Sequence, residues 1–230
     1  MERRQLIRAG LSAAMAVAFS FCAFAQRYPT KPIPMVVPFP PGGVADTVGR
    51  PVAEAMSRYL KQPIVVENKG GAGGGIGMAQ VAKSKGDGYT VLMSLSSLVV
   101  LPEADKILQR QPMFQVNQLK PIARFTADPT VLVVRSDSPW KTYAEFIAYA
   151  KANPGKLNFA SSGAGSIQHI AGEMLQQQTG TEMTHVPYKG ASPAVQDLLG
   201  GSVDIFITTP ASVVAQVKAN KLRALGVTGN

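Results

Sequence analysis

The chain has 230 residues and carries 23 Lys and Arg against 14 Asp and Glu, a formal net charge of +9. This length allows one large or two small α/β domains. The basic residues are scattered singly and are not interleaved with aromatic side chains, so we exclude nucleic-acid binding, although the positive balance mildly attracts anionic solutes.

The first 25 residues predict a secretory signal peptide. A basic start with three arginines precedes the apolar stretch 9–21, and residues 23–25 (Ala-Phe-Ala) form a cleavage signal. The apolar stretch is too short to remain as a bilayer-spanning helix. We therefore expect cleavage after Ala25 and export to the periplasm, by either the general secretory or the twin-arginine route. Cleavage removes Cys22, the single cysteine, and with it any thiol chemistry.

Short apolar runs then alternate with helical patterns, which is typical of βαβ units and a largely parallel sheet. In the first half they predict strands over 33–37, 64–67, 90–94 and 119–125, and helices over 45–60, 77–83 and 103–109. In the second half they predict strands over 131–134, 157–160, 183–186, 203–207 and 222–227, and helices over 142–152, 167–178, 191–199 and 212–219. This α/β pattern predicts two lobes with a cleft between them, 26–122 and 123–221, joined by strand 119–125. Residues 222–230 would begin the return to the first lobe.

Residues 38–47, which we name the first loop, lie between a strand and a helix. Prolines end the strand, two glycines allow positive φ, and the first N–H groups of the helix lack intrahelical partners. Several N–H donors and the helix dipole favour an anion, and no nucleophile is paired with a base there, so we predict carboxylate binding rather than catalysis. The alternative is a simple turn. The candidate binding residues are Gly42, Gly43, Val44, Ala45 and Asp46, with the Asp46 side chain capping the helix.

Residues 161–169, the second loop, repeat this arrangement in the other lobe. Glycines allow close approach of a ligand, hydroxyls can donate, and the following helix supplies its N-terminus. The candidates here are Ser162, Gly163, Ala164, Gly165, Ser166 and His169. Weaker candidates are Ser94 and Ser97, which follow the third strand, and Tyr188, which either lines the cleft or lies at its rim.

Two motifs that could indicate a cofactor do not do so. The glycine run 70–77 has neither a G-x-G-x-x-G register nor a Walker lysine, so it is not a nucleotide-binding loop. The histidines, His169 and His185, have no carboxylate at the spacing of a zinc site. We therefore expect no cofactor and no metal.

Seven motifs occur in order along nearly the whole mature chain, at residues 28–33, 38–46, 66–74, 87–90, 162–169, 185–190 and 197–204. Among them are P-F-x-P-G-G-x-A-D at 38–46, V-E-N-K-x-G-A-G-G at 66–74 and H-V-P-Y-K-G at 185–190. With these motifs the chain resembles the periplasmic receptors of tripartite tricarboxylate transporters, the Bug-type receptors.

The resemblance implies a two-lobed, Venus-flytrap (type II) periplasmic-binding-protein fold. It also implies a small carboxylate ligand (a di- or tricarboxylate, an acidic amino acid or an aromatic acid) and membrane permease subunits as partners. Residues 94–114 and 207–210 depart from the family pattern where they would border the cleft, which adds Thr208 to the candidates. Family members continue beyond residue 228, so the resemblance also implies a C-terminally truncated chain with an incomplete first lobe.

Two alternatives stay open beside a monomeric, non-enzymatic receptor. A truncated fragment would bind nothing. A serine hydrolase would use Ser166 and His169, although Ser166 is not part of a G-x-S-x-G elbow.

Overall fold

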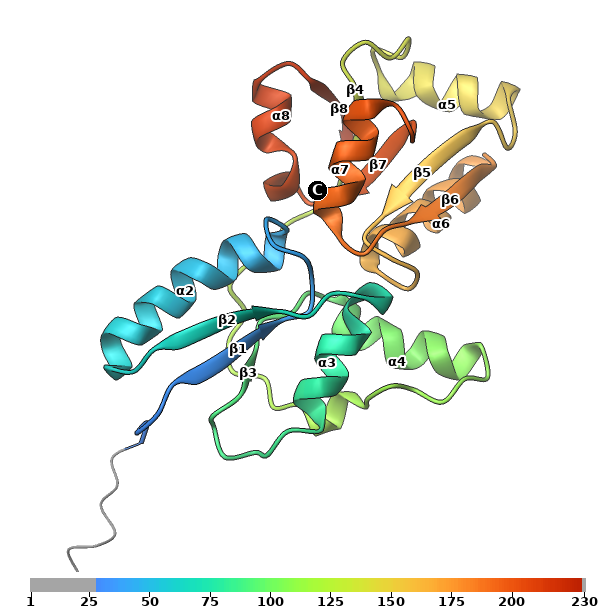
Figure 1. Ribbon diagram of the computed structural model, residues 1–230. Coiled ribbons are helices and arrows are strands. Elements are labelled where there is room, and N and C mark those ends of the chain that lie inside the picture. The colour runs from blue at the N-terminus through green and yellow to red at the C-terminus, as the bar shows by residue number, and fades with distance from the viewer. Residues whose placement is uncertain (1–27, 229–230) are drawn as a thin grey trace, which may run out of the picture.

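Two sheets organise residues 28–228, the part of the chain that the computed structural model describes (Figure 1). The first lobe contains a three-stranded parallel sheet of order β2-β1-β3, and the second lobe a five-stranded sheet of order β6-β5-β7-β4-β8. The predicted α/β, two-lobed fold is therefore confirmed. The predicted signal peptide and Cys22 lie outside the described residues.

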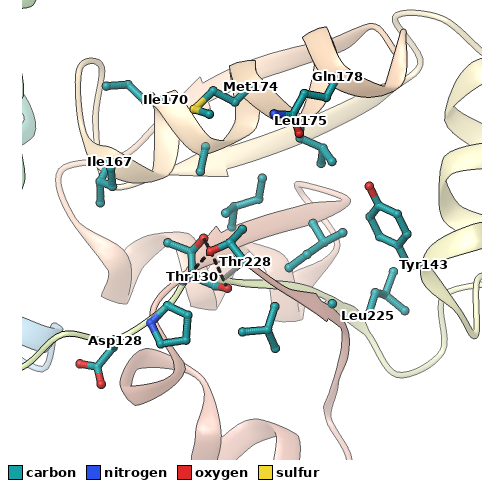
Figure 2. A pocket seen from close by; sticks show the side chains of 16 residues that line it. Asp128, Thr130, Tyr143, Ile167, Ile170, Met174, Leu175, Gln178, Leu225 and Thr228 are labelled. Carbon is teal, nitrogen blue, oxygen red and sulfur yellow. Dashed lines mark hydrogen bonds between the residues drawn. The ribbon is translucent and has the colours of Figure 1, made fainter. Parts of the chain in front are cut away.

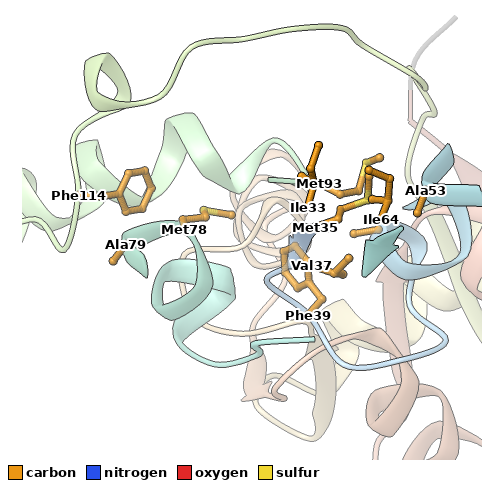
Figure 3. Packing of buried hydrophobic residues seen from close by; sticks show 11 residues of the cluster. Ile33, Met35, Val37, Phe39, Ala53, Ile64, Met78, Ala79, Met93 and Phe114 are labelled. Atoms are coloured by element: carbon orange, nitrogen blue, oxygen red, sulfur yellow. The ribbon is translucent and has the colours of Figure 1, made fainter. Parts of the chain in front are cut away.

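The first lobe follows the predicted order of elements. They are β1 (Ile33–Val37), α2 (Val44–Leu60), β2 (Ile64–Asn68), the 3-10 turn η2 (Ala72–Gly74), α3 (Gly75–Ala82), β3 (Val91–Leu92), α4 (Ser97–Ile107) and the 3-10 turn η3 (Val116–Gln118). Alternate residues of β1, namely Ile33, Met35 and Val37, point into one core cluster. Side chains of α2 and α3 complete this cluster, among them Ala53 and Met78 (Figure 3).

The second lobe has a core on each face of its sheet. Its elements are β4 (Val131–Arg135), α5 (Tyr143–Ala152), β5 (Leu157–Ser161), α6 (Ile167–Thr179), β6 (Met183–Pro187), α7 (Ala191–Gly200), β7 (Ile205–Thr208), the 3-10 turn η4 (Pro210–Ser212), α8 (Val214–Lys218) and β8 (Leu222–Val227). Val131 and Val133 pack with α7 on one face, whereas Leu132 and Val134 pack with α5 on the other. Because side chains of a strand alternate between faces, a nearly continuous apolar run predicts such a doubly covered strand.

The largest correction concerns 222–227, expected to begin the return to the first lobe. This segment is β8 and pairs antiparallel with β4 at the edge of the second sheet, and β4 also pairs antiparallel with β7. The second sheet is thus mixed rather than parallel. The physical reason is that β4 would otherwise have an edge of unpaired backbone N–H and C=O groups, and β8 pairs with them. Burial of Leu222 in the second core adds to this pairing.

Three local predictions in the first half were also wrong. Residues 119–125 form no strand: Ile122 and Phe125 are exposed, and no strand among the described residues pairs with this segment. The predicted strand 90–94 contracts to β3. The predicted helix 103–109 instead begins at Ser97, because Leu98 and Leu101 pack against the first core and extend the helix towards its N-terminus. No helix within residues 28–228 combines the length and apolar character needed to cross a bilayer.

Candidate functional site

The predicted site residues lie at the carboxyl ends of parallel strands. The first loop follows β1, Ser94 and Ser97 follow β3, the second loop follows β5, Tyr188 follows β6 and Thr208 ends β7. The two carboxyl edges meet where the lobes meet (Figure 1). In open α/β sheets this edge is where ligands bind, because strand-to-helix loops present backbone groups and helix N-termini there.

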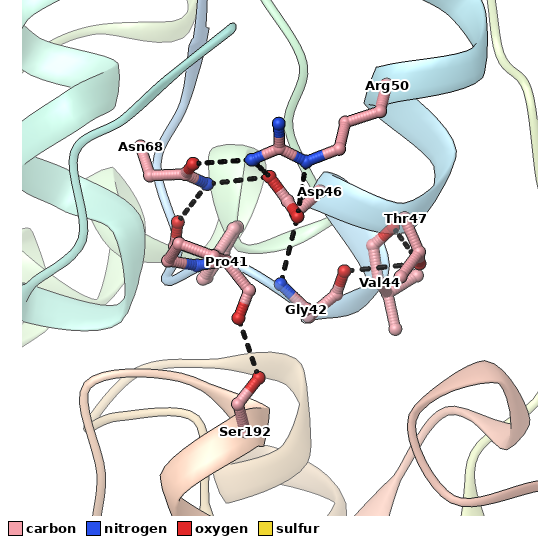
Figure 4. Close-up of polar contacts among 10 residues, drawn as sticks. Pro41, Gly42, Val44, Asp46, Thr47, Arg50, Asn68 and Ser192 are labelled. Carbon is pink, nitrogen blue, oxygen red and sulfur yellow. Dashed lines mark hydrogen bonds and ion pairs between the residues drawn. The ribbon is translucent and has the colours of Figure 1, made fainter. Parts of the chain in front are cut away.

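A charged network holds the first loop (Figure 4). The Asp46 carboxylate is 3% exposed and accepts hydrogen bonds from Gly42 N, from Arg50 Nε and Nη2, and from Asn68 Nδ2, each 2.9 Å long. Burial opposes ionisation, but the hydrogen bonds from Arg50, Gly42 and Asn68 outweigh it and lower the pKa of Asp46. The carboxylate is therefore an internal brace of the loop, with its oxygens already engaged.

This network corrects two predictions about the first loop. The N-cap of α2 is Gly43, whereas Asp46 lies in the first turn and reaches back to Gly42 N. Only Gly42 has a positive φ, +77°, since Gly43 is extended at −77°. Arg50 was not predicted, although the i, i+4 spacing of Asp46 and Arg50 on a helix was a usable signal.

Hydrogen bonds within the first loop occupy some of the backbone N–H groups that could otherwise bind a ligand. Gly42 N donates to Asp46, Gly43 N to Pro40 O at 3.4 Å, and Asp46 N to Gly43 O at 3.0 Å. The N–H groups of Val44 and Ala45 have no acceptor among residues 28–228, as is usual for the first positions of a helix. These two groups are the donors that the first loop offers to an anion.

The second loop is held by neutral groups. Gly163 N donates to Ser161 Oγ at 3.1 Å, and Gly165 N donates to His169 Nδ1 at 3.2 Å. Both glycines have positive φ, +130° and +75°, which a glycine adopts without strain. Ser166 Oγ caps α6 by accepting from His169 N at 3.3 Å. Ser162 is buried at the start of the loop, and the carbonyl of Ala164 faces the first lobe at Gly73.

The same geometry bears on the hydrolase alternative. His169 Nδ1 accepts from Gly165 N, and His169 Nε2 lies 3.4 Å from Glu173 Oε1. The Ser166 hydroxyl meets the backbone of His169 rather than its ring. A serine nucleophile needs a hydrogen bond to its base, and this pair is arranged as a helix cap instead.

Two predicted residues present buried hydroxyls without a partner. Ser97 Oγ in the first lobe (1% exposed) and Thr208 Oγ1 in the second (0% exposed) have no hydrogen bond among the described residues. Buried hydroxyls normally have one, and leaving one unpaired costs about 1–3 kcal/mol. Ser94 Oγ, by contrast, donates to Leu95 O at 3.2 Å. Ser97 and Thr208 are therefore the fully buried hydroxyls at the two strand edges that have a hydrogen bond still to make.

Tyr188 is directed away from this set. Its hydroxyl donates to Asp197 Oδ2 at 2.7 Å, on α7, and its ring packs against the second core. Burial, together with this hydrogen bond, raises the pKa of Tyr188 to about 12. The side chain thus secures the turn between β6 and α7.

Close contacts join the lobes at these loops. Ser192 Oγ of α7 donates to Pro41 O at 3.0 Å (Figure 4). A Cβ atom at Gly163 would lie 2.9 Å from Gly73 N, and one at Gly190 would lie 2.3 Å from Pro40 Cδ. Only glycine permits this approach, so the glycine runs of the two lobes are contact surfaces as well as turns.

A cavity of about 820 Å³ lies elsewhere, on the α6 side of the second sheet near β8 (Figure 2). Apolar side chains dominate its lining, including Ile170, Met174 and Leu225, and Thr130 and Thr228 hydrogen-bond to each other at its edge. None of the predicted site residues lines it. The cavity and the candidate site are therefore separate features.

The sequence profile of the tripartite tricarboxylate transporter family receptors matches residues 48–230. A UPF0065 protein of Pseudomonas sp. strain P51 is 38% identical over 226 residues, which are 98% of this chain and 66% of that protein. The protein BugT of Bordetella pertussis is 40% identical over 203 residues, 88% of this chain and 62% of its own length. The chain thus spans less than two thirds of the length of these two relatives.

Solved structures of periplasmic receptors are also similar to this chain. The periplasmic binding protein BugD aligns with a TM-score of 0.81 at 36% identity, over 88% of this chain and 67% of its own. Rpa4515 of R. palustris with adipate aligns at 0.80 with 30% identity, over 87% and 67%. MatC of Rhodopseudomonas palustris with bound malate aligns at 0.79 with 29% identity, over 88% and 68%. The chain belongs to the tripartite tricarboxylate transporter family of solute-binding receptors.

Proposed function

We propose that the chain is a periplasmic receptor that captures a small dicarboxylate between its lobes and presents it to the permease subunits of a tripartite transporter. One observation carries the proposal: Ser97 and Thr208, predicted from the sequence as site residues, are the buried hydroxyls without partners at the two facing strand edges. The chain spans about two thirds of the solved receptors, so the activity of the whole receptor is part of this proposal.

The chemistry of the donors supports a carboxylate. Val44 N, Ala45 N and the Ser97 hydroxyl come from the first lobe, and Thr208 comes from the second. All are neutral hydrogen-bond donors, and hydrogen bonds from such groups to an ionised acceptor contribute about 1.5–3 kcal/mol each. A bound acid therefore needs no cationic side chain and no cofactor.

A donor set on each lobe suits an acid with a carboxylate at each end. Two of the similar solved proteins hold acids of this kind, Rpa4515 with adipate and MatC with bound malate. Such a ligand bridges the lobes only when they are closed, so it stabilises the closed state by the contacts that the open state lacks. The glycine contacts at Gly73, Gly163 and Gly190 describe how closely the lobes approach in that state.

Calorimetry with malate, adipate and citrate tests the proposal on the mature chain. We expect at least one dicarboxylate to bind, and Ser97→Ala or Thr208→Val to weaken that binding about 10- to 100-fold, because each removes one hydrogen bond to a charged group. The exposed Ser202→Ala and Thr184→Val are matched controls and should bind normally. A cooperatively folded chain that binds none of these acids would contradict the proposal.

A further inference from the structure

A stacked pair of histidines lies beneath the second loop. The rings of His169 on α6 and His185 on β6 are parallel within 14°, with centroids 3.8 Å apart. Phe159 of β5 lies beside the pair, with its ring centroid 4.9 Å from that of His185 and 6.3 Å from that of His169. The pair is thus fixed between the core of the second lobe and the loop above it.

Each ring holds one glycine of the loop. His169 Nδ1 accepts directly from Gly165 N at 3.2 Å. His185 Nε2 lies 2.7 Å from Ser161 Oγ, which in turn accepts from Gly163 N at 3.1 Å. Gly163 is also the residue whose backbone touches the first lobe at Gly73. The shape of the loop therefore depends on two imidazole nitrogens.

The contact of His169 with Gly165 N requires a neutral His169 ring. His185 Nε2, by contrast, can donate to Ser161 Oγ, because the Ser161 hydroxyl itself donates to Gly163 O at 3.1 Å. A protonated Nδ1 cannot accept from Gly165 N, and two charged rings at stacking distance repel each other. Burial and the neighbouring His169 lower the pKa of His185 from 6.5 to about 4. The charged group facing the pair is Glu173 on α6, whose Oε1 lies 3.4 Å from His169 Nε2. The neighbours from β5 are Phe159 and Ser161, and neither side chain changes its charge between pH 3 and pH 7.

We propose that His169 and His185 are positioning residues that keep the second loop in its binding conformation while both rings are neutral, so that acidification weakens ligand capture. This inference rests on the proposed function only for its effect on binding. Its effect on loop conformation stands apart, because the two glycine amides report it in the absence of any ligand.

The first experiment is a pH titration of the unliganded chain followed by NMR. We expect the amide resonances of Gly163 and Gly165 to shift with the same midpoints as the ring resonances of the two histidines. Glycines remote from the pair, such as Gly155, should not follow those midpoints. Unchanged Gly163 and Gly165 resonances through both histidine titrations would overturn the inference, whatever the chain binds.

The second experiment measures malate affinity between pH 7 and pH 3, a range that covers the lowered pKa of His185. If one histidine must lose its proton for binding, the Kd rises about tenfold per unit of pH below the titration. The double variant His169→Asn/His185→Gln keeps an acceptor near each original nitrogen but does not titrate, so its affinity should change less with pH than that of the native chain. Protonation of malate itself affects both proteins equally.

The outcomes separate the two proposals. Glycine shifts that follow the histidines, without malate binding at any pH, would leave the positioning role standing and count against malate as the ligand. Equal pH profiles for the native chain and the double variant would overturn the regulatory inference while leaving carboxylate binding intact. If the double variant does not fold, the NMR titration of the native chain still shows whether the two histidines position the second loop.

Discussion

The first and second loops perform the same task with different chemistry. Each leaves a parallel strand, turns at a glycine with positive φ and opens a helix. The first is braced by a buried carboxylate with a guanidinium and an amide, whereas the second is braced by hydroxyl and imidazole groups. The comparison teaches that two loops with the same backbone motif can respond differently to pH. The side chains that support each loop determine that response.

Removing the brace of the first loop should have the largest effect. Asp46→Ala leaves Arg50, Asn68 and Gly42 N without their shared acceptor. We expect the free energy of unfolding to fall by about 3 kcal/mol, since hydrogen bonds to charged groups contribute about 1.5–3 kcal/mol each and Arg50 is half exposed. Urea denaturation measures this. Asp46→Asn, which keeps the shape, should lose less, and equal losses would show that the charge is not what braces the loop.

A side chain in the second loop should have an intermediate effect. Gly163→Ala places a Cβ atom 2.9 Å from Gly73 N at a φ of +130°, so it strains the turn and separates the lobes. We expect a loss of about 2 kcal/mol in unfolding free energy, within the range for overpacking and strain. The matched control is Gly155→Ala, where φ is +71° but nothing lies within 4 Å. If both variants lose the same stability, only the φ matters and the lobe contact does not.

The pH dependence of stability should show the smallest effect and the clearest separation of the loops. His185 has a lowered pKa, so the unfolded chain takes up its proton first and stability falls as pH drops from 6.5 towards about 4. Asp46 also has a lowered pKa, so its contribution is present above 3.8 and is lost below it. Solvent screening moderates the histidine effect because His185 is only partly buried.

Denaturation midpoints at pH 7, 5, 4 and 3 test this assignment. His185→Gln should flatten the interval between pH 6.5 and 4, and Asp46→Asn should flatten only the interval below 3.8. A histidine variant that still loses the same stability between pH 6.5 and 4 would show that another group titrates there.

Much of the fold could be predicted because the chain carries local signals at the element ends. The periodicity of 45–60 predicted α2 to within one residue, and the apolar run 33–37 predicted β1. Segment 119–125 was also predicted as a strand but has no partner strand, and β8 found a partner in the second lobe instead of the first. Strand pairing is a non-local choice, which a single segment does not encode.

Part of the candidate site, too, could be predicted from the sequence, and part could not. Positions along the chain predicted both loops and Ser97, because glycine, proline and hydroxyl residues cluster after apolar runs. Thr208 became a candidate only through the family resemblance. Position alone did not show that Tyr188 turns towards Asp197, or that His169 and His185 stack. Those contacts join segments whose distance in space is set by packing.

The amino-acid sequence by itself determined the order of βα units, the two glycine loops that open helices, and the family to which the chain belongs. Only the tertiary structure decided which strands pair, which loop amides remain free, and which side chains brace each loop. The physical reason is range: turn and helix signals act over a few neighbouring residues, whereas sheet edges and buried polar contacts are satisfied by groups that only folding brings together.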